Sequence, residues 1–323
     1  MKYLFKKGVF LPLLFLVQPF FIGELFSQTV WAPYQRQLWV RTTAVNSVYD
    51  SAYVGRYHTT YDDDVRINVG ALAFEYGITD RLTVDLQTGF GKLGRTQLID
   101  RYFGTLTSPE QPDKYGIIDS RAGLRYKVLD EYDFDSIWVP TVSVRIGGIK
   151  KGDYDRNPQA LGDGANGAEV NIYLGKDFNI WGLGALGEWS YRRREKPVPD
   201  DVLYYGALYK RFFDSFIFIV GSRGQIGQGG YAFADPKGTP PLNLIQIDTP
   251  SIAPFGTDWY NYYLEHERPA WGRKEIYHNL EVSLGYTDKY GNYYNFFYSH
   301  TYSGYNTAIL RTFGFLINFP FNL

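Results

Sequence analysis

Cysteine is absent from this chain of 323 residues, and methionine occurs only once. Without cysteine the protein has no disulfides, no thiolate metal sites and no cysteine for a lipid anchor. The formal net charge of −1 gives no argument for a nucleic-acid partner. Beyond residue 22 no stretch approaches about 18 consecutive apolar residues, so we expect no helical membrane anchor there.

Aromatic residues and glycine are abundant instead. The chain has 29 Tyr, 23 Phe, 7 Trp and 34 Gly, and aromatic residues make up 18% of it. This mixture is typical of a barrel wall with an apolar outer face, a polar inner face and aromatic residues at both membrane interfaces.

The first 27 residues predict a cleaved signal peptide. Lys2, Lys6 and Lys7 precede an apolar segment at 8–22, and Ser27 is the expected last residue before cleavage. The alternative is an uncleaved membrane helix, which the two prolines of the segment and its short length disfavour. Residues 28–323 then form one exported domain, a barrel in the outer membrane.

Alternating apolar and polar residues predict a β-hairpin at 65–90. In the first arm Val65, Val69 and Ala71 share one face with their apolar neighbours at alternate positions. In the second arm the residues at 82, 84, 86 and 90 do so, after a tight turn at 77–80. Each arm has about 9–11 residues, enough to cross a membrane as a tilted strand.

The hairpin pattern recurs along the chain and predicts an all-β fold, a transmembrane antiparallel β-barrel of about 12 strands. Short links alternate with long ones, which predicts short periplasmic turns and long extracellular loops. The long links are expected at 46–64, 92–115, 148–167 and 225–274. A secreted β-sandwich or a β-propeller also uses many short strands, but neither predicts this alternation.

The C-terminal strand carries a further sign of membrane insertion. Phe315, Ile317, Phe319, Phe321 and Leu323 occupy alternate positions up to the last residue. This ending resembles the signal read by the barrel-insertion machinery, which is an expected partner during assembly. That signal usually ends in an aromatic residue, whereas this one ends in leucine.

The turn of the hairpin resembles a known family. Residues 75–84, E-Y-G-I-T-D-R-L-T-V, are similar to a turn of outer-membrane proteins in the MetA-pathway-of-phenol-degradation family, and more loosely to fatty-acid-transporter-like barrels. The resemblance implies the barrel fold rather than a substrate. Fatty-acid transporters carry an N-terminal hatch, and residues 28–34 are too short for one.

Charged residues on the strand faces opposite the apolar ones predict a charged lumen. The set includes Arg66 and Lys210, and the selectivity candidates are Arg121, Arg125, Lys127, Arg145, Asp119 and Glu169. One interpretation is a set of structural salt bridges in a narrow barrel. The other is a weakly anion-preferring channel, because rings of basic side chains favour anions.

The long link at 225–274 is a second candidate site, because loops of this length are usually functional or disordered. Its apolar content argues against full disorder. One interpretation is a lid that packs on itself. The other is a plug or substrate platform, for which the candidates are Tyr231, Phe233, Phe255, Trp259 and Tyr260.

Enzyme motifs are missing from the sequence. It contains no H-E-x-x-H, no G-x-S-x-G and no glycine-rich phosphate loop, so we predict no catalytic residues, no metal site and no cofactor. Ser299 and His300 are adjacent on a predicted strand and point to opposite faces, so they do not form a catalytic pair.

The sequence therefore predicts an outer-membrane barrel for passage or uptake of small molecules, hydrophobic ones included. Its expected partners are outer-membrane lipid and the solute. The alternative is a closed barrel that presents its long loops to a binding partner, as an adhesin or a structural protein does.

Overall fold

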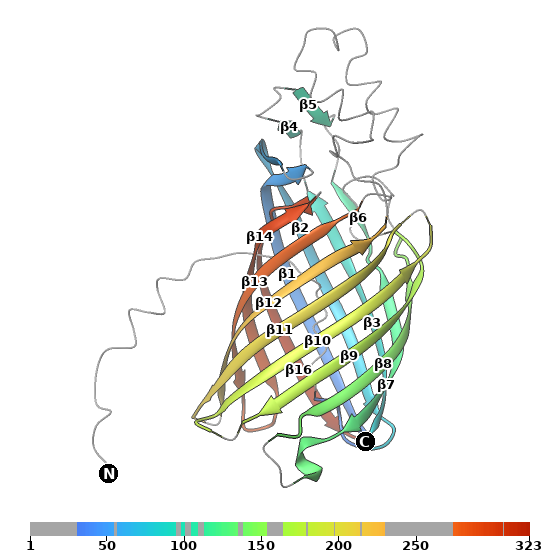
Figure 1. Ribbon diagram of the computed structural model, residues 1–323, viewed down its shortest axis with the longest axis vertical. Coiled ribbons are helices and arrows are strands. Elements are labelled where there is room, and N and C mark those ends of the chain that lie inside the picture. The colour runs from blue at the N-terminus through green and yellow to red at the C-terminus, as the bar shows by residue number, and fades with distance from the viewer. Residues whose placement is uncertain are drawn as a thin grey trace, which may run out of the picture.

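A computed structural model of the chain shows a tilted β-barrel (Figure 1). The structure describes residues 31–54, 57–94, 98–100, 105–108, 113–134, 138–153, 164–178, 180–196, 198–213, 215–229, 274–305 and 307–323. The predicted signal peptide and the five aromatic candidates between residues 231 and 260 lie outside these ranges, so both stay predictions.

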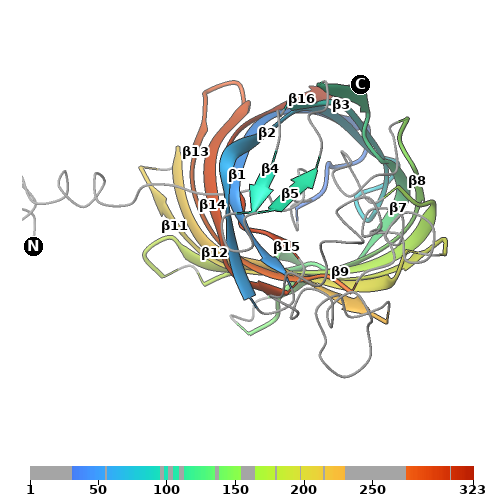
Figure 2. The same cartoon turned by 90° about the horizontal axis from the view of Figure 1, so that it is seen from above.

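Twelve long antiparallel strands close into a barrel, which confirms the predicted fold class. The first strand pairs with the second on one side and with the last on the other, so the sheet has no free edge along its length (Figure 2). The strands are β1 (Gln37–Val54), β2 (Tyr57–Gly77), β3 (Leu82–Gly94), β7 (Ser120–Leu129), β8 (Thr141–Lys150), β9 (Gly167–Asp177), β10 (Leu183–Arg194), β11 (Asp200–Phe212), β12 (Phe216–Gln228), β13 (Ile276–Thr287), β14 (Tyr293–Tyr305) and β16 (Arg311–Asn322).

The predicted hairpin is confirmed as β2 and β3, with Phe74 opposite Leu86 in the register. Its turn is closed by Thr79, whose hydroxyl oxygen accepts a hydrogen bond from the backbone N–H of Leu82 at 2.9 Å. Local side-chain bonds of this kind favour a turn over continued strand.

The turn between β13 and β14 is ordered by Asp288. Its carboxylate accepts hydrogen bonds from the backbone N–H groups of Tyr290 (2.8 Å) and Asn292 (3.0 Å). Loss of hydration acts to raise the pKa of Asp288, but hydrogen bonds from Asn292, Tyr290 and Tyr294 outweigh it and lower the pKa. Gly291 has a φ of +85°, which a residue without a side chain adopts at little cost.

The two ends of the barrel differ, as predicted. The turns cluster at the end that carries the C-terminus, together with the 3₁₀-helix η2 (Glu131–Asp133) (Figure 1). The short strands lie at the other end, called here the loop end. These short strands are β4 (Leu98–Asp100), β5 (Thr105–Ser108), β6 (Lys114–Ile117) and β15 (Thr307–Ala308).

The prediction of a loop at 46–64 is wrong. β1 and β2 continue through it and pair as far as Val54 opposite Tyr57. The alternation is hard to see there because polar residues such as Asn46 and Asn68 lie on the outer face, opposite one another in the register and joined by a 2.8 Å hydrogen bond. Pairing with the neighbouring strand thus extends the wall beyond the apolar pattern.

The outer face of the barrel is apolar and aromatic. Exposed side chains on it include Leu86, Leu124, Ile146 and Phe296. Large aromatic side chains are exposed near the turn end, with Trp138 at 84%, Trp181 at 83% and Phe213 at 90%. An apolar band edged by aromatic residues is the surface that a barrel presents to lipid. Within the described ranges, no helix is long and apolar enough to cross a membrane.

Closure of the barrel is testable through Ser47 on β1 and Thr312 on β16, which lie opposite one another with their hydroxyl oxygens 3.0 Å apart. Opposed residues of antiparallel strands have the Cα separation that a disulfide requires. We expect the double variant S47C/T312C to form an intramolecular disulfide under oxidation, seen as a mobility shift of the denatured chain that reductant reverses. The pair S47C/F313C, whose side chains point to opposite faces, is the control, and equal crosslinking of both pairs would contradict the register.

Candidate functional site

The selectivity candidates on β7 all face the lumen, but they do not form one free basic cluster. The side chains of Arg121, Arg125 and Lys127 are 12%, 2% and 11% exposed, and each lies against a carboxylate. Arg121 is 3.6 Å from Glu169, and Lys127 is 2.6 Å from Asp130 in the following turn.

Arg145 on β8 is the centre of the most buried network. Its guanidinium donates two hydrogen bonds to Asp85 on β3, at 2.7 and 2.8 Å. It also donates to Glu169 and, at 3.1 Å, to Asn171, both on β9. The fork geometry of arginine suits such two-point contacts with a carboxylate. One cation thus links three strands that are not all neighbours in the sheet.

A second network joins Glu75 on β2 to two arginines. Arg41 on β1 and Arg125 on β7 each place a guanidinium nitrogen 3.0 Å from one of its carboxylate oxygens. Arg125 also donates a 3.3 Å hydrogen bond to the backbone carbonyl of Trp31. This network therefore lies near the turn end, where the chain enters β1.

The remaining candidate, Asp119, lies apart from these networks. One carboxylate oxygen is 3.5 Å from Arg194 on β10, and the other accepts a 2.9 Å hydrogen bond from the backbone N–H of Gly152. The six candidates thus occupy several levels of the barrel rather than a single constriction.

The structure adds lumen residues that the sequence analysis did not select. Arg192 on β10 donates two hydrogen bonds to Asp201 on β11, at 2.6 and 2.9 Å. Arg211 on β11 is 2.8 Å from Asp177 on β9. Arg192 alternates with Ser190 and Arg194 on the inner face of β10, so the alternation in the sequence is the signal that could have found it.

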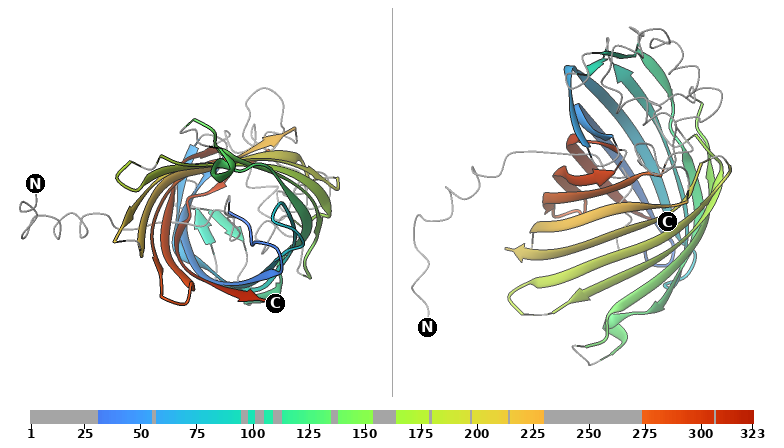
Figure 3. Two further views of the ribbon diagram at one scale, coloured as in Figure 1. Left: turned by 90° about the horizontal axis from the view of Figure 1, so that it is seen from below. Right: turned by 45° about the horizontal axis from the view of Figure 1, so that its top comes forward.

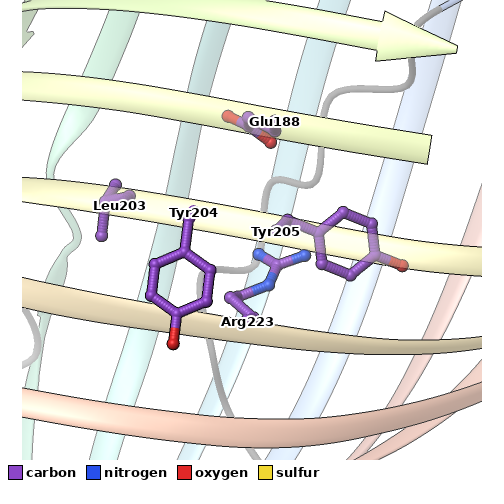
Figure 4. Close-up of a pocket in the computed structure, with 5 residues that line it drawn as sticks. All are labelled: Glu188, Leu203, Tyr204, Tyr205 and Arg223. Carbon is purple, nitrogen blue, oxygen red and sulfur yellow. The ribbon is translucent and has the colours of Figure 1, made fainter.

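Figure 4 shows a small pocket on the β10–β12 side of the barrel. The guanidinium of Arg223 lies 4.8 Å from the ring centre of Tyr205 and 3.8 Å from Glu281 on β13. Tyr205 donates a 3.4 Å hydrogen bond to that carboxylate. This lumen cation is thus held by both a carboxylate and an aromatic ring. The pocket is lined by Glu188, Leu203, Tyr204, Tyr205 and Arg223.

Two expected lumen charges face outward instead, and the prediction for both is wrong. Arg66 on β2 has a side chain 65% exposed, and Lys210 on β11 alternates with inward-facing Tyr209. Arg66 was misplaced because the apolar face of β2 turns inward at this height. Lys210 was misplaced by one position, since Tyr209 and Arg211 occupy the inner face. Basic and acidic groups in the lumen are therefore closely matched.

One wall of the lumen is apolar. Val65, Val69, Ala71 and Ala73 on β2 are at most 7% exposed and face inward, against the expectation that they meet lipid. At the loop end Tyr49, Val65 and Leu93 form a buried cluster with Ile67, Ala308 and Leu310 packed against it. The lumen thus has an apolar strip on β2, from Val65 to Ala73, which faces the charged side chains of β7–β13.

The start of the described chain lies inside the lumen. Seen from below, the blue segment before β1 runs within the ring of strands (Figure 3, left). The ring of Trp31 meets that of Tyr209 on β11 edge-on, with 5.8 Å between centroids. A segment too short for a folded hatch therefore still occupies the bore.

Comparison with solved structures supports the fold. The chain is similar to an outer membrane channel from Pseudomonas putida F1, with 14% identity, 90% of this chain and 97% of that chain covered, and a TM-score of 0.59. It also matches the KdgM porin (8% identity, 86% and 99% covered, TM-score 0.39) and the CymD monoaromatic hydrocarbon channel (8%, 90% and 89%, TM-score 0.40), scores too low to carry an argument. No family model and no curated protein matches the sequence, so the resemblance to the MetA-pathway family stays a prediction.

The Arg145 network predicts a large stability difference between two arginine variants. Arg145→Ala leaves Asp85 and Glu169 buried without their shared cation, which we expect to lower the free energy of unfolding by about 3–5 kcal/mol. Arg66→Ala removes only an exposed pair 3.7 Å from Asp64, and we expect a change below about 1 kcal/mol. Urea unfolding of both variants, refolded in the same lipid, measures this. Similar losses would contradict a structural role for the network.

Proposed function

We propose that this barrel admits small molecules, hydrophobic ones included, across an outer membrane. The observation that carries the proposal is the two-sided lumen. The apolar strip on β2 offers a surface for the apolar part of a solute. The charged side chains facing that strip, and the water around them, offer hydrogen-bond partners to the polar part of the solute.

The paired charges favour weak rather than strong ion selectivity. Because Arg145, Arg125 and Arg223 each lie against carboxylates, little net positive potential remains for anions. We propose Arg121 as a selectivity residue. Its side chain is 12% exposed and its separation from Glu169, 3.6 Å, is longer than that of the Arg145 pairs.

The proposed setting is the outer membrane of a Gram-negative-type cell. The apolar outer band with its aromatic edge supports contact with lipid. The alternating apolar side chains of β16 lie on that outer face and support recognition by the barrel-insertion machinery. We propose, further, that residues 1–27 are removed as a signal peptide. A closed barrel that binds a partner through its loops is the second candidate, and the experiment below separates the two.

The first test is single-channel conductance of the refolded protein in a planar bilayer under a salt gradient. We expect steady conductance with a slight anion preference. Arg121→Gln should move the reversal potential toward cation preference because it removes a positive charge from the lumen and leaves Glu169 in place. The outward-facing Arg66→Gln is the control and should leave it unchanged. Silence of a folded, inserted protein would overturn the channel and favour the loop-binding barrel.

The apolar strip generates a second test, in which proteoliposome swelling compares a small aromatic solute with a sugar of similar size. Val69→Gln places an amide on the inner face, so we expect the aromatic flux to fall severalfold relative to the sugar flux. Asn68→Gln, on the outer face of the same strand, should change neither flux. An unchanged ratio in Val69→Gln would remove the argument for hydrophobic solutes.

A further inference from the structure

The segment before β1, residues 31–36, is fixed to the turn end of β2 and is called here the strap. The backbone N–H of Arg36 donates a 2.8 Å hydrogen bond to the carbonyl of Gly77. The backbone N–H of Gln35 donates a 3.1 Å bond to Asp80. Arg36 has a φ of +61°, a conformation that L residues adopt rarely and that turns the chain sharply before β1.

The far end of the strap is held by the opposite wall. The guanidinium of Arg211 on β11 lies 5.7 Å from the ring centre of Trp31, and Tyr209 meets the same ring edge-on. Arg125 on β7 donates its hydrogen bond to the Trp31 carbonyl. Cation–π and aromatic contacts of this kind hold a tryptophan ring in place without a covalent link.

The order of strands shows that these contacts cross the bore. From β1 to β11 the sheet passes through β16, β14, β13 and β12 in one direction. In the other direction it passes through β2, β3, β7, β8, β9 and β10. β11 therefore lies almost opposite β1, and the strap reaches from one wall to the other. The view from below shows the strap within the ring of strands (Figure 3, left).

We propose that the strap is a gate at the turn-side mouth of the lumen and that Trp31 sets the size limit for solutes. The inference rests on the proposed function, since a gate needs a path to close. Trp31 contributes a large ring at the far end of the strap, and its contacts with Arg211 and Tyr209 are non-covalent, so they can break and reform as solutes pass.

Gly77 allows the gate to be tested without changing the strap itself. A Cβ on Gly77 would lie 2.0 Å from the carbonyl oxygen of Tyr34 and 2.8 Å from that of Pro33, so Gly77→Ala must move the strap off the wall. Gly70→Ala on the same strand is the matched control, because a Cβ there meets nothing within 4 Å. Trp31→Ala removes the ring and tests the same gate by another route.

The experiment measures conductance of the four proteins, each shown to be folded by its heat-dependent mobility on a gel. We expect severalfold higher conductance in Gly77→Ala and Trp31→Ala than in the parent, and no change in Gly70→Ala. Because the chain has no cysteine, Ala32→Cys gives one labelling site on the strap. Its reaction with a water-soluble maleimide should speed up in the Gly77→Ala background.

The outcomes separate the gate from the channel. If labelling is faster in the Gly77→Ala background but conductance is unchanged, the strap has moved without widening the path for ions. This result overturns the gate and leaves the channel proposal intact. If the parent conducts and neither Gly77→Ala nor Trp31→Ala raises its conductance, the gate is likewise overturned and the channel proposal remains. Silence of all four folded proteins overturns the channel itself and the gate with it. If Gly77→Ala does not fold, Trp31→Ala against Gly70→Ala decides.

Discussion

A sheet that crosses lipid must pair every backbone N–H and C=O within itself, and this constraint organises the whole molecule. It is met by the closure of β1 against β16, where twelve consecutive residue pairs run from Gln37 opposite Asn322 to Val48 opposite Arg311. Closure fixes which side of each strand is inside. All the side-chain chemistry of the lumen follows from that single choice of register.

Closure also creates the interior that the charges must fill. Arginine side chains at the lumen face are too long to stay isolated in a narrow bore, and burying an unpaired charge is costly. Each is therefore matched by a carboxylate from another strand, as Arg145 is by Asp85 and Arg192 by Asp201. The same bonds that stabilise the wall reduce the net potential of the lumen, which links stability directly to weak selectivity.

The apolar cluster around Val65 and the strap lie at opposite ends of the lumen. The cluster around Val65 lies at the loop end, and Trp31 lies at the turn end. A solute entering from the loop end would meet the apolar strip and the paired charges facing it first, and the strap last. The proposed function and the proposed gate thus use successive parts of one bore.

The sequence predicts the barrel, about twelve strands, the alternation of turns and long links except the link at 46–64, and the polar positions at 121, 125, 127 and 145, because a two-residue period needs no distant partner to be visible. It misplaced Arg66 and the apolar face of β2. Apolar side chains suit both lipid and a packed interior, and only the register with β1 and β3 decides between the two. Only the tertiary structure shows which carboxylate each arginine meets, how far β1 and β2 extend, and that the strap spans from Gly77 to the contacts of Trp31 with β11. Each of these depends on residues far apart in the chain that closure of the barrel brings together.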